Sequence, residues 1–145
     1  MKAFLKKTFY GIAKAVVALA VLATAYSCTS NTLELQQDFP FEVTFMPVPK
    51  EVASGQIVEI RITIKPGGHY SGTEYFIHYF QFDGQGSLHR DGQPNYIPND
   101  SYVLPQNEFR LYYTALSSVS QSFDVWISDS FGNEELLHFQ FNSSD

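Results

Sequence analysis

The chain of 145 residues has little basic charge, a single cysteine and no apolar run long enough to cross a membrane. Its 9 Lys and Arg oppose 15 Asp and Glu, and four of the lysines lie among the first fourteen residues. The rest of the chain has 5 basic and 15 acidic side chains, so we expect no binding to nucleic acid through a basic face. The length suits one domain with its own core and is too short for two.

The N-terminal segment has the features of an export signal. Met1–Lys14 is basic, and the apolar run Ala15–Ala23 that follows has nine residues, against the roughly 20 that a membrane-spanning helix needs. A basic stretch, a short apolar stretch and small residues at a cut site are typical of a signal peptide. Because no second long apolar run follows, the sequence predicts that the chain leaves the cytoplasm.

Cys28 is the only cysteine, so an exported chain offers it no partner for an intramolecular disulfide. It follows the apolar run with Ser27 before it, which resembles a bacterial lipobox and predicts lipidation of Cys28. Ala25 and Tyr26 depart from the usual lipobox, and an ordinary signal cut near Ser27 with an incidental thiol is the alternative. The expected organisation is a lipoprotein signal peptide over 1–27, a lipidated N-terminus and flexible tether over 28–38, and a domain over 39–145.

From residue 39 onward, apolar and polar residues alternate with a period of two, which is typical of half-buried β-strands. Glu74–Phe82 is apolar on both faces, which indicates a strand with neighbours on both sides, and Asp129–Asn133 predicts a hairpin turn. The expected strands lie within 39–45, 58–64, 74–82, 109–114, 123–127 and 137–141, with short ones over 87–89 and 102–104, and Asp83–Asp100 is the one long loop region. This pattern predicts an all-β fold, an immunoglobulin-like β-sandwich of about seven strands, with a small open barrel as the alternative.

Motifs for catalysis or metal binding are missing from the sequence. The histidines His69, His78, His89 and His138 show no HExxH spacing and no CxxC context. There is no GxSxG serine, and the glycine-rich segment Asp83–Ser87 neither follows the ligand order of an EF-hand nor belongs to a phosphate-binding βαβ unit. We therefore expect no catalytic residue, no metal and no cofactor. A metal site assembled through space from His78, His138 and loop carboxylates is the alternative.

One surface of the predicted sandwich could bind a partner. Because the apolar residues on either side of it alternate inward, Trp126 is expected to point outward, beside His138 of the next strand. Tyr75 and Tyr79 are expected on the same face, since phenylalanine tolerates full burial better than tyrosine. Exposed tryptophans often anchor binding, so these four residues form a candidate binding face. The alternative is that residues 91–100 fold over this face and bury it.

Five separated parts of the chain carry a family resemblance. They are Phe39–Val43 with Met46–Pro49, Gly55–Arg61, Tyr79–Gln81 with Asp83–Leu88, Phe109–Thr114, and Asp129–Gly132. In this order they resemble the TraQ family, small lipoproteins encoded within the conjugative transposons of Bacteroides-type bacteria. The resemblance covers essentially the whole domain and implies an immunoglobulin-like sandwich tethered to the envelope. It supplies no catalytic or binding residues.

The function expected from these observations is that of a non-enzymatic lipoprotein, lipid-anchored in the cell envelope at the outer membrane. It would assemble or stabilise the mating apparatus of a conjugative transposon through contacts with other conjugal transfer proteins. The membrane leaflet is left open, because no acidic run follows Cys28. The alternative function is that of a surface lipoprotein that binds glycans by stacking Trp126 and the tyrosines on sugar rings. The fold does not decide between them, because sandwiches of this kind host many functions.

Overall fold

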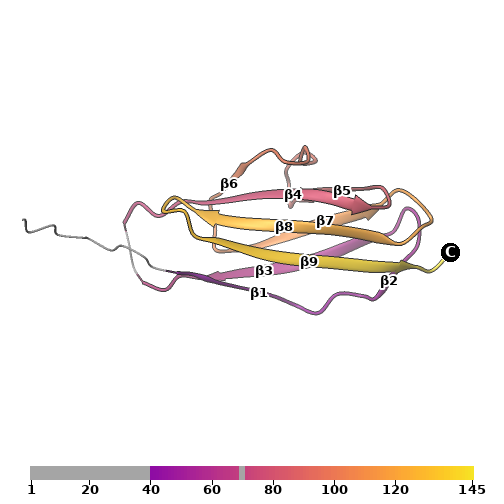
Figure 1. The fold of residues 1–145 in the computed structure, drawn as a ribbon, viewed down its shortest axis with the longest axis horizontal. Coiled ribbons are helices and arrows are strands. Elements are labelled where there is room, and N and C mark those ends of the chain that lie inside the picture. Colours follow the sequence, from indigo (N-terminus) through magenta and orange to yellow (C-terminus); the bar gives the residue numbers. More distant parts are fainter. Residues whose placement is uncertain (1–39, 69–70) are drawn as a thin grey trace, which may run out of the picture. The chain divides into compact units, whose positions relative to one another are not determined.

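The computed structural model describes residues 40–68 and 71–145, which form nine β-strands in two sheets (Figure 1). The four-stranded sheet has the order β1-β3-β7-β5, with β1 Glu42–Phe45, β3 Ile57–Lys65, β7 Glu108–Ala115 and β5 Gly86–Arg90. The five-stranded sheet has the order β2-β9-β8-β4-β6, with β2 Glu51–Val52, β9 Glu134–Ser143, β8 Gln121–Asp129, β4 Tyr75–Asp83 and β6 Tyr102–Leu104. None of the described residues belongs to a helix long and apolar enough to cross a membrane. The predicted signal peptide, Cys28 and the tether lie outside the described residues.

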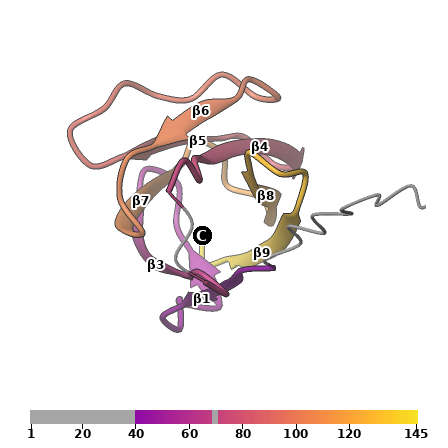
Figure 2. The ribbon, with the colours of Figure 1, turned by 90° about the vertical axis from the view of Figure 1, so that its left-hand side faces the viewer.

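The two sheets face each other across a common core, as the end-on view shows (Figure 2). All strand pairs are antiparallel except β2 with β9. The strand orders correspond to those of an immunoglobulin sandwich: β1-β3-β7-β5 in one sheet, and β9-β8-β4 at the centre of the other. The predicted all-β sandwich is therefore confirmed, with nine strands in place of about seven.

The N-terminal strands belong to different sheets. β1 pairs with β3, and β2 pairs with β9 of the opposite sheet. The segment Met46–Pro49 lies between them, and its two prolines lack the N–H groups that a continuous ladder needs. The chain therefore leaves one sheet at Phe45 and joins the other at Glu51.

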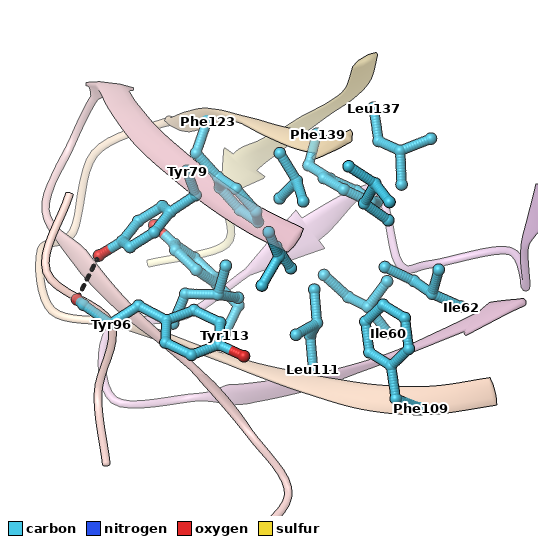
Figure 3. Packing of buried hydrophobic residues seen from close by; sticks show 14 of the residues in the cluster. Ile60, Ile62, Tyr79, Tyr96, Phe109, Leu111, Tyr113, Phe123, Leu137 and Phe139 are labelled. Atoms are coloured by element: carbon cyan, nitrogen blue, oxygen red, sulfur yellow. Dashed lines mark hydrogen bonds between the residues drawn. The ribbon is translucent and has the colours of Figure 1, made fainter. Parts of the chain in front are cut away.

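The core follows the alternation predicted from the sequence. In β3 the apolar residues from Val58 to Ile64 point inward, and Glu59 and Arg61 point outward. Aromatic rings from the two sheets stack at its centre, with the Tyr113 ring centroid 4.2 Å from that of Phe123 (Figure 3). The interior is therefore filled by interdigitating side chains from both inner faces, as in other sandwiches.

A buried polar network closes one end of the core. The Tyr113 hydroxyl donates to Gln121 Oε1 at 2.7 Å, and Gln81 Nε2 donates to the Tyr113 oxygen at 2.9 Å. The backbone of the turn between β4 and β5 packs closely against this network. A Cβ added to Gly86 would lie 2.2 Å from the Tyr113 oxygen, and one added to Gly84 would lie 2.6 Å from Gln121 Oε1. The glycine-rich segment is thus explained by close packing of backbone against buried side chains.

The β8–β9 connection is the hairpin predicted from the sequence. One carboxylate oxygen of Asp129 accepts hydrogen bonds from the backbone N–H groups of Phe131 and Asn133, both at 2.9 Å. The other accepts from the Asn133 side-chain amide at 2.8 Å, and Gly132 takes a positive φ of 92°. The Asp129 side chain therefore organises the turn that sets the register of β9 against β8.

The predicted long loop 83–100 is interrupted by strand β5. The remainder, from residue 91 to β6, lies outside the sandwich beside β5 and β6 (Figure 2). It inserts one side chain, that of Tyr96, into the core, where it is 6% exposed. Backbone hydrogen bonds from Tyr96 to Leu88 at 2.7 Å and from Asn99 to Tyr79 at 2.9 Å hold the loop against both sheets.

Candidate functional site

The strand register places Trp126 on the outer surface of the five-stranded sheet. In β8 its neighbours Val125 and Ile127 are fully buried, so period two directs Trp126 away from the core, where it is half-buried. Its partner in β4 is His78, whose ring stacks on the indole with centroids 4.8 Å apart and planes 3° apart. Its partner in β9 is Leu136, which is 53% exposed.

The expectation that Tyr75 and Tyr79 share this outer face is wrong. They are 7% and 2% exposed and point into the core (Tyr79 in Figure 3). The Tyr79 hydroxyl donates to the backbone carbonyl of Tyr96 at 3.5 Å, and Tyr75 packs edge-on against Phe41. Burial raises the pKa of both tyrosines. Tyrosine is accepted inside because the loop after β5 brings Tyr79 a hydrogen-bond partner that the sequence pattern could not reveal.

The outer positions of β4 are instead taken by Phe76, His78 and Phe80. Phe80 is 36% exposed and lies edge-on to Phe82, which is 54% exposed, with ring centroids 5.0 Å apart. Val103 of β6, opposite Phe76, is 55% exposed. We call this surface the aromatic face; it consists of Phe76, His78, Phe80, Phe82, Val103, Trp126 and Leu136.

Residues 91–100 do not bury the aromatic face. The loop packs on Tyr79 and Leu88, both of which are core residues, through the hydrogen bonds of Asn99 and Tyr96. Phe82, Val103 and Leu136 stay more than half exposed. Exposed apolar patches across several strands are uncommon on monomers unless they bind something, so this face is the leading candidate for a functional surface.

His138 lies at the border of the aromatic face and contacts a carboxylate there. Its Nδ1 is 2.5 Å from Asp124 Oδ1, the two residues being directly opposite in β9 and β8. Asp124 also lies opposite Phe80, so its carboxylate adjoins the exposed rings. The structure thus brings His138 and Trp126 to one face, as expected, and adds a carboxylate that the sequence argument did not include.

The outer surface of the four-stranded sheet differs in character. Glu59 of β3 forms ion pairs with Arg61 at 2.5 Å and with Arg110 of β7 at 3.7 Å. The hydrogen bond from Arg61 lowers the pKa of the Glu59 carboxyl. His89 stacks on Tyr112 next to this cluster, at a centroid distance of 5.5 Å. This surface is charged, with Glu59 paired to two arginines, whereas the aromatic face is apolar.

Within residues 40–68 and 71–145, no three His, Cys, Asp or Glu side chains are grouped so that they could hold a metal ion. His78, which the metal alternative requires, stacks on Trp126, and His138 pairs with Asp124. The two histidines therefore take part in separate interactions on the sheet surface.

The sequence and fold are similar to those of known proteins. A family model described as TraQ conjugal transfer protein matches residues 11–144. A crystal structure of a conjugative transposon lipoprotein from Bacteroides eggerthii is 49% identical, covers 72% of this chain and 98% of its own, and has a TM-score of 0.68. A lipoprotein from Bacteroides thetaiotaomicron solved by NMR is 43% identical over 79% of this chain and 88% of its own, with a TM-score of 0.69.

A third similar structure is a conjugate transposon protein from Bacteroides vulgatus, also solved by NMR. It is 45% identical, covers 77% of this chain and 91% of its own, and has a TM-score of 0.65. Among curated proteins, none is similar to this chain in sequence. Neither the family model nor these three structures is described by an enzymatic activity.

Proposed function

We propose, from the premise that this chain belongs to the TraQ conjugal transfer protein family, that it is a non-enzymatic lipoprotein that assembles or stabilises a conjugal transfer apparatus. The observation that carries the proposal is the family match, which extends over residues 11–144. Proteins with similar folds from two Bacteroides species are described as belonging to conjugative transposons. In this role the protein acts through contacts with other conjugal transfer proteins.

The proposed attachment to the envelope is a lipid on Cys28. Two of the similar structures are described as lipoproteins, and Cys28 directly follows a basic and then apolar N-terminal segment. Two or more acyl chains hold a folded domain stably on a membrane surface, whereas one chain binds only reversibly. The protein is then a lipid-anchored component of the cell envelope, at the outer membrane.

The proposed contact surface is the aromatic face. Several large apolar side chains are exposed there on adjacent strands, and aromatic residues are over-represented among the side chains that dominate protein interfaces. On the opposite outer surface Arg61 and Arg110 are both paired with Glu59, which leaves that surface less suited to docking or to contact with DNA.

The proposal is tested by deleting the gene from a donor strain and counting transconjugants. The deletion is complemented with the intact gene or with Cys28→Ala, and the amount and membrane attachment of each protein are measured by immunoblotting of fractions. We expect transfer to fall on deletion and to be restored only by the intact gene. The Cys28→Ala protein should be present but no longer attached through lipid.

One result would count against this function, and another would count against the lipid anchor alone. If transfer is unchanged by deletion, the protein is not part of the transfer machinery, and its binding to purified surface polysaccharides becomes the next experiment. If Cys28→Ala restores transfer fully, the protein acts in transfer but needs no lipid anchor.

A further inference from the structure

Charge is divided unequally between the two sheets. The strands of the four-stranded sheet carry Arg61, Lys65, Arg90 and Arg110 together with three carboxylates. No strand of the five-stranded sheet, all of which are described, contains Lys or Arg, and together they contain six carboxylates. These are Glu51, Asp83, Asp124, Asp129, Glu134 and Glu135. The sheet with the aromatic face is therefore the acidic one.

Two of these carboxylates border the aromatic face. Glu134 is exposed in the same outward-pointing row of β9 as Leu136 and His138. Asp124 follows the same row of β8 as Trp126 and lies opposite Phe80. The exposed apolar side chains are thus bordered by Glu134 and by the Asp124–His138 contact, and by no Lys or Arg from their own sheet. Arg90 of the other sheet reaches only the β6 edge of the face, where its Nη1 donates to the Val103 carbonyl at 3.3 Å.

We propose that the aromatic face binds a polypeptide segment in which apolar side chains are interleaved with Lys or Arg. This inference rests on the proposed function and identifies the chemistry of the partner and the surface that receives it. The apolar side chains of such a segment would cover the exposed rings of Phe80 and Phe82, which lose contact with water on binding. Its cations would lie near the exposed Glu134, since Asp124 already contacts His138, and this attraction speeds association and orients the segment.

Other occupants fit this surface less well. Sugar rings stack on an open, flat aromatic platform, whereas one side of Trp126 is covered by His78 and Phe80 stands edge-on to Phe82. A second copy that docked face to face would bring together two acidic sheets whose strands contain no Lys or Arg. An anionic lipid surface would be repelled by the same charges.

Trp126 is the only tryptophan in the chain, so its fluorescence reports directly on the aromatic face. The full chain, purified in neutral detergent micelles, is titrated with a short peptide that alternates Leu with Lys and with a matched peptide that has Glu in place of Lys. The peptides lack tryptophan and tyrosine, and micelles with peptide alone serve as the blank. We expect the Leu–Lys peptide to shift the Trp126 emission to shorter wavelength and the Leu–Glu peptide to leave it unchanged.

Matched charge-reversal variants separate this surface from general attraction between a cationic peptide and an acidic protein. Glu134→Lys should weaken binding of the Leu–Lys peptide about three- to five-fold or more. Glu108→Lys changes the net charge equally but lies in β7 of the other sheet, and it should have a much smaller effect. Phe80→Ser or Leu136→Ser should weaken binding without altering the far-ultraviolet circular dichroism spectrum.

The inference is overturned if the Leu–Lys peptide causes no shift, if both peptides act alike, or if Glu108→Lys weakens binding as much as Glu134→Lys. A shift produced by polysaccharides alone would assign the face to glycans, and a shift on raising the protein concentration alone would assign it to self-association. The transfer assay in the donor strain distinguishes failure of this inference from failure of the proposed function. If deletion abolishes transfer but Phe80→Ser and Leu136→Ser both transfer normally, the protein works in transfer and this face is not its contact.

Discussion

Substitution of Gly86 by alanine tests the close packing between the β4–β5 turn and the core. The added methyl group would lie 2.2 Å from the Tyr113 oxygen and 2.3 Å from the ring carbon that carries it. Tyr113 has no room to retreat, because its ring is fully buried, stacks on Phe123 at 4.2 Å and donates its hydroxyl to Gln121. Either the turn or the ring must therefore move.

The expected cost follows from these contacts. Overpacking a well-filled core costs about 1–3 kcal/mol. Disturbing the buried hydrogen bond between Tyr113 and Gln121 adds roughly 1 kcal/mol. A total loss of about 2–4 kcal/mol lowers the melting temperature of a domain of this size by roughly 10 °C or more. Thermal unfolding of the purified chain, followed by far-ultraviolet circular dichroism, measures the shift.

Gly92→Ala is the matched control for this experiment. Gly92 has a positive φ of 70° and nothing within 4 Å of its added Cβ, whereas Gly86 has the clash without a positive φ. We expect the control to lose only about 1 kcal/mol, through backbone strain alone. A Gly86→Ala protein that melts within the error of the wild type, or no lower than Gly92→Ala, would refute the packing argument.

Three further predictions concern buried polar groups. Gln121→Leu removes the donor that satisfies the carbonyl oxygens of Ser117 and Val119 at 3.1 and 2.8 Å, so urea unfolding should show a loss of about 2 kcal/mol, and an unchanged midpoint would contradict this. Asp129→Ala removes three hydrogen bonds from the β8–β9 turn and should cost about 1–3 kcal/mol in the same assay, whereas the nearby exposed Ser130→Ala should cost much less. Burial raises the pKa of Tyr79, Tyr96 and Tyr113, so these groups stay protonated in the folded chain while the unfolded chain ionises above about pH 10. The contribution of these tyrosines to the free energy of unfolding should therefore be fully present below about pH 10. Above that pH it should fall, by up to about 1.4 kcal/mol per pH unit for each such tyrosine. Urea unfolding at several alkaline pH values measures this fall, and a smaller fall in Tyr113→Phe is the check on its origin.

The parts of the fold that could be predicted are those where one face of a strand is polar. In β3 the glutamate and arginine positions identify the outer face, and the inner face follows. The hairpin of β8 and β9 could be predicted because Gly132 and Asn133 favour a turn between two alternating runs. The Trp126 and His138 positions followed from the same alternation.

Strand β4 could not be oriented in this way, because both of its faces are apolar or aromatic. The deciding information is the register with β8, which sets His78 opposite Trp126 and so puts Phe76 and Phe80 outside. A general preference of phenylalanine for burial is weaker than a hydrogen bond supplied to Tyr79 by a distant loop. The exposure of Val103 and Leu136 could likewise not be predicted from the sequence, because it depends on which strands become neighbours.

The change of sheet between β1 and β2 determines how the domain resists tension. A pull on Pro40 along the axis of β1 loads its pairs with β3, from Glu42 with Lys65 to Phe45 with Ile62, all at once and parallel to the strands. Strands pulled lengthwise must break their cross-strand bonds together, whereas strands peeled apart break them one at a time. Beyond the prolines, β2 ties the same segment to β9 of the other sheet. Mechanical load arriving from the N-terminal side is thereby shared by both halves of the sandwich.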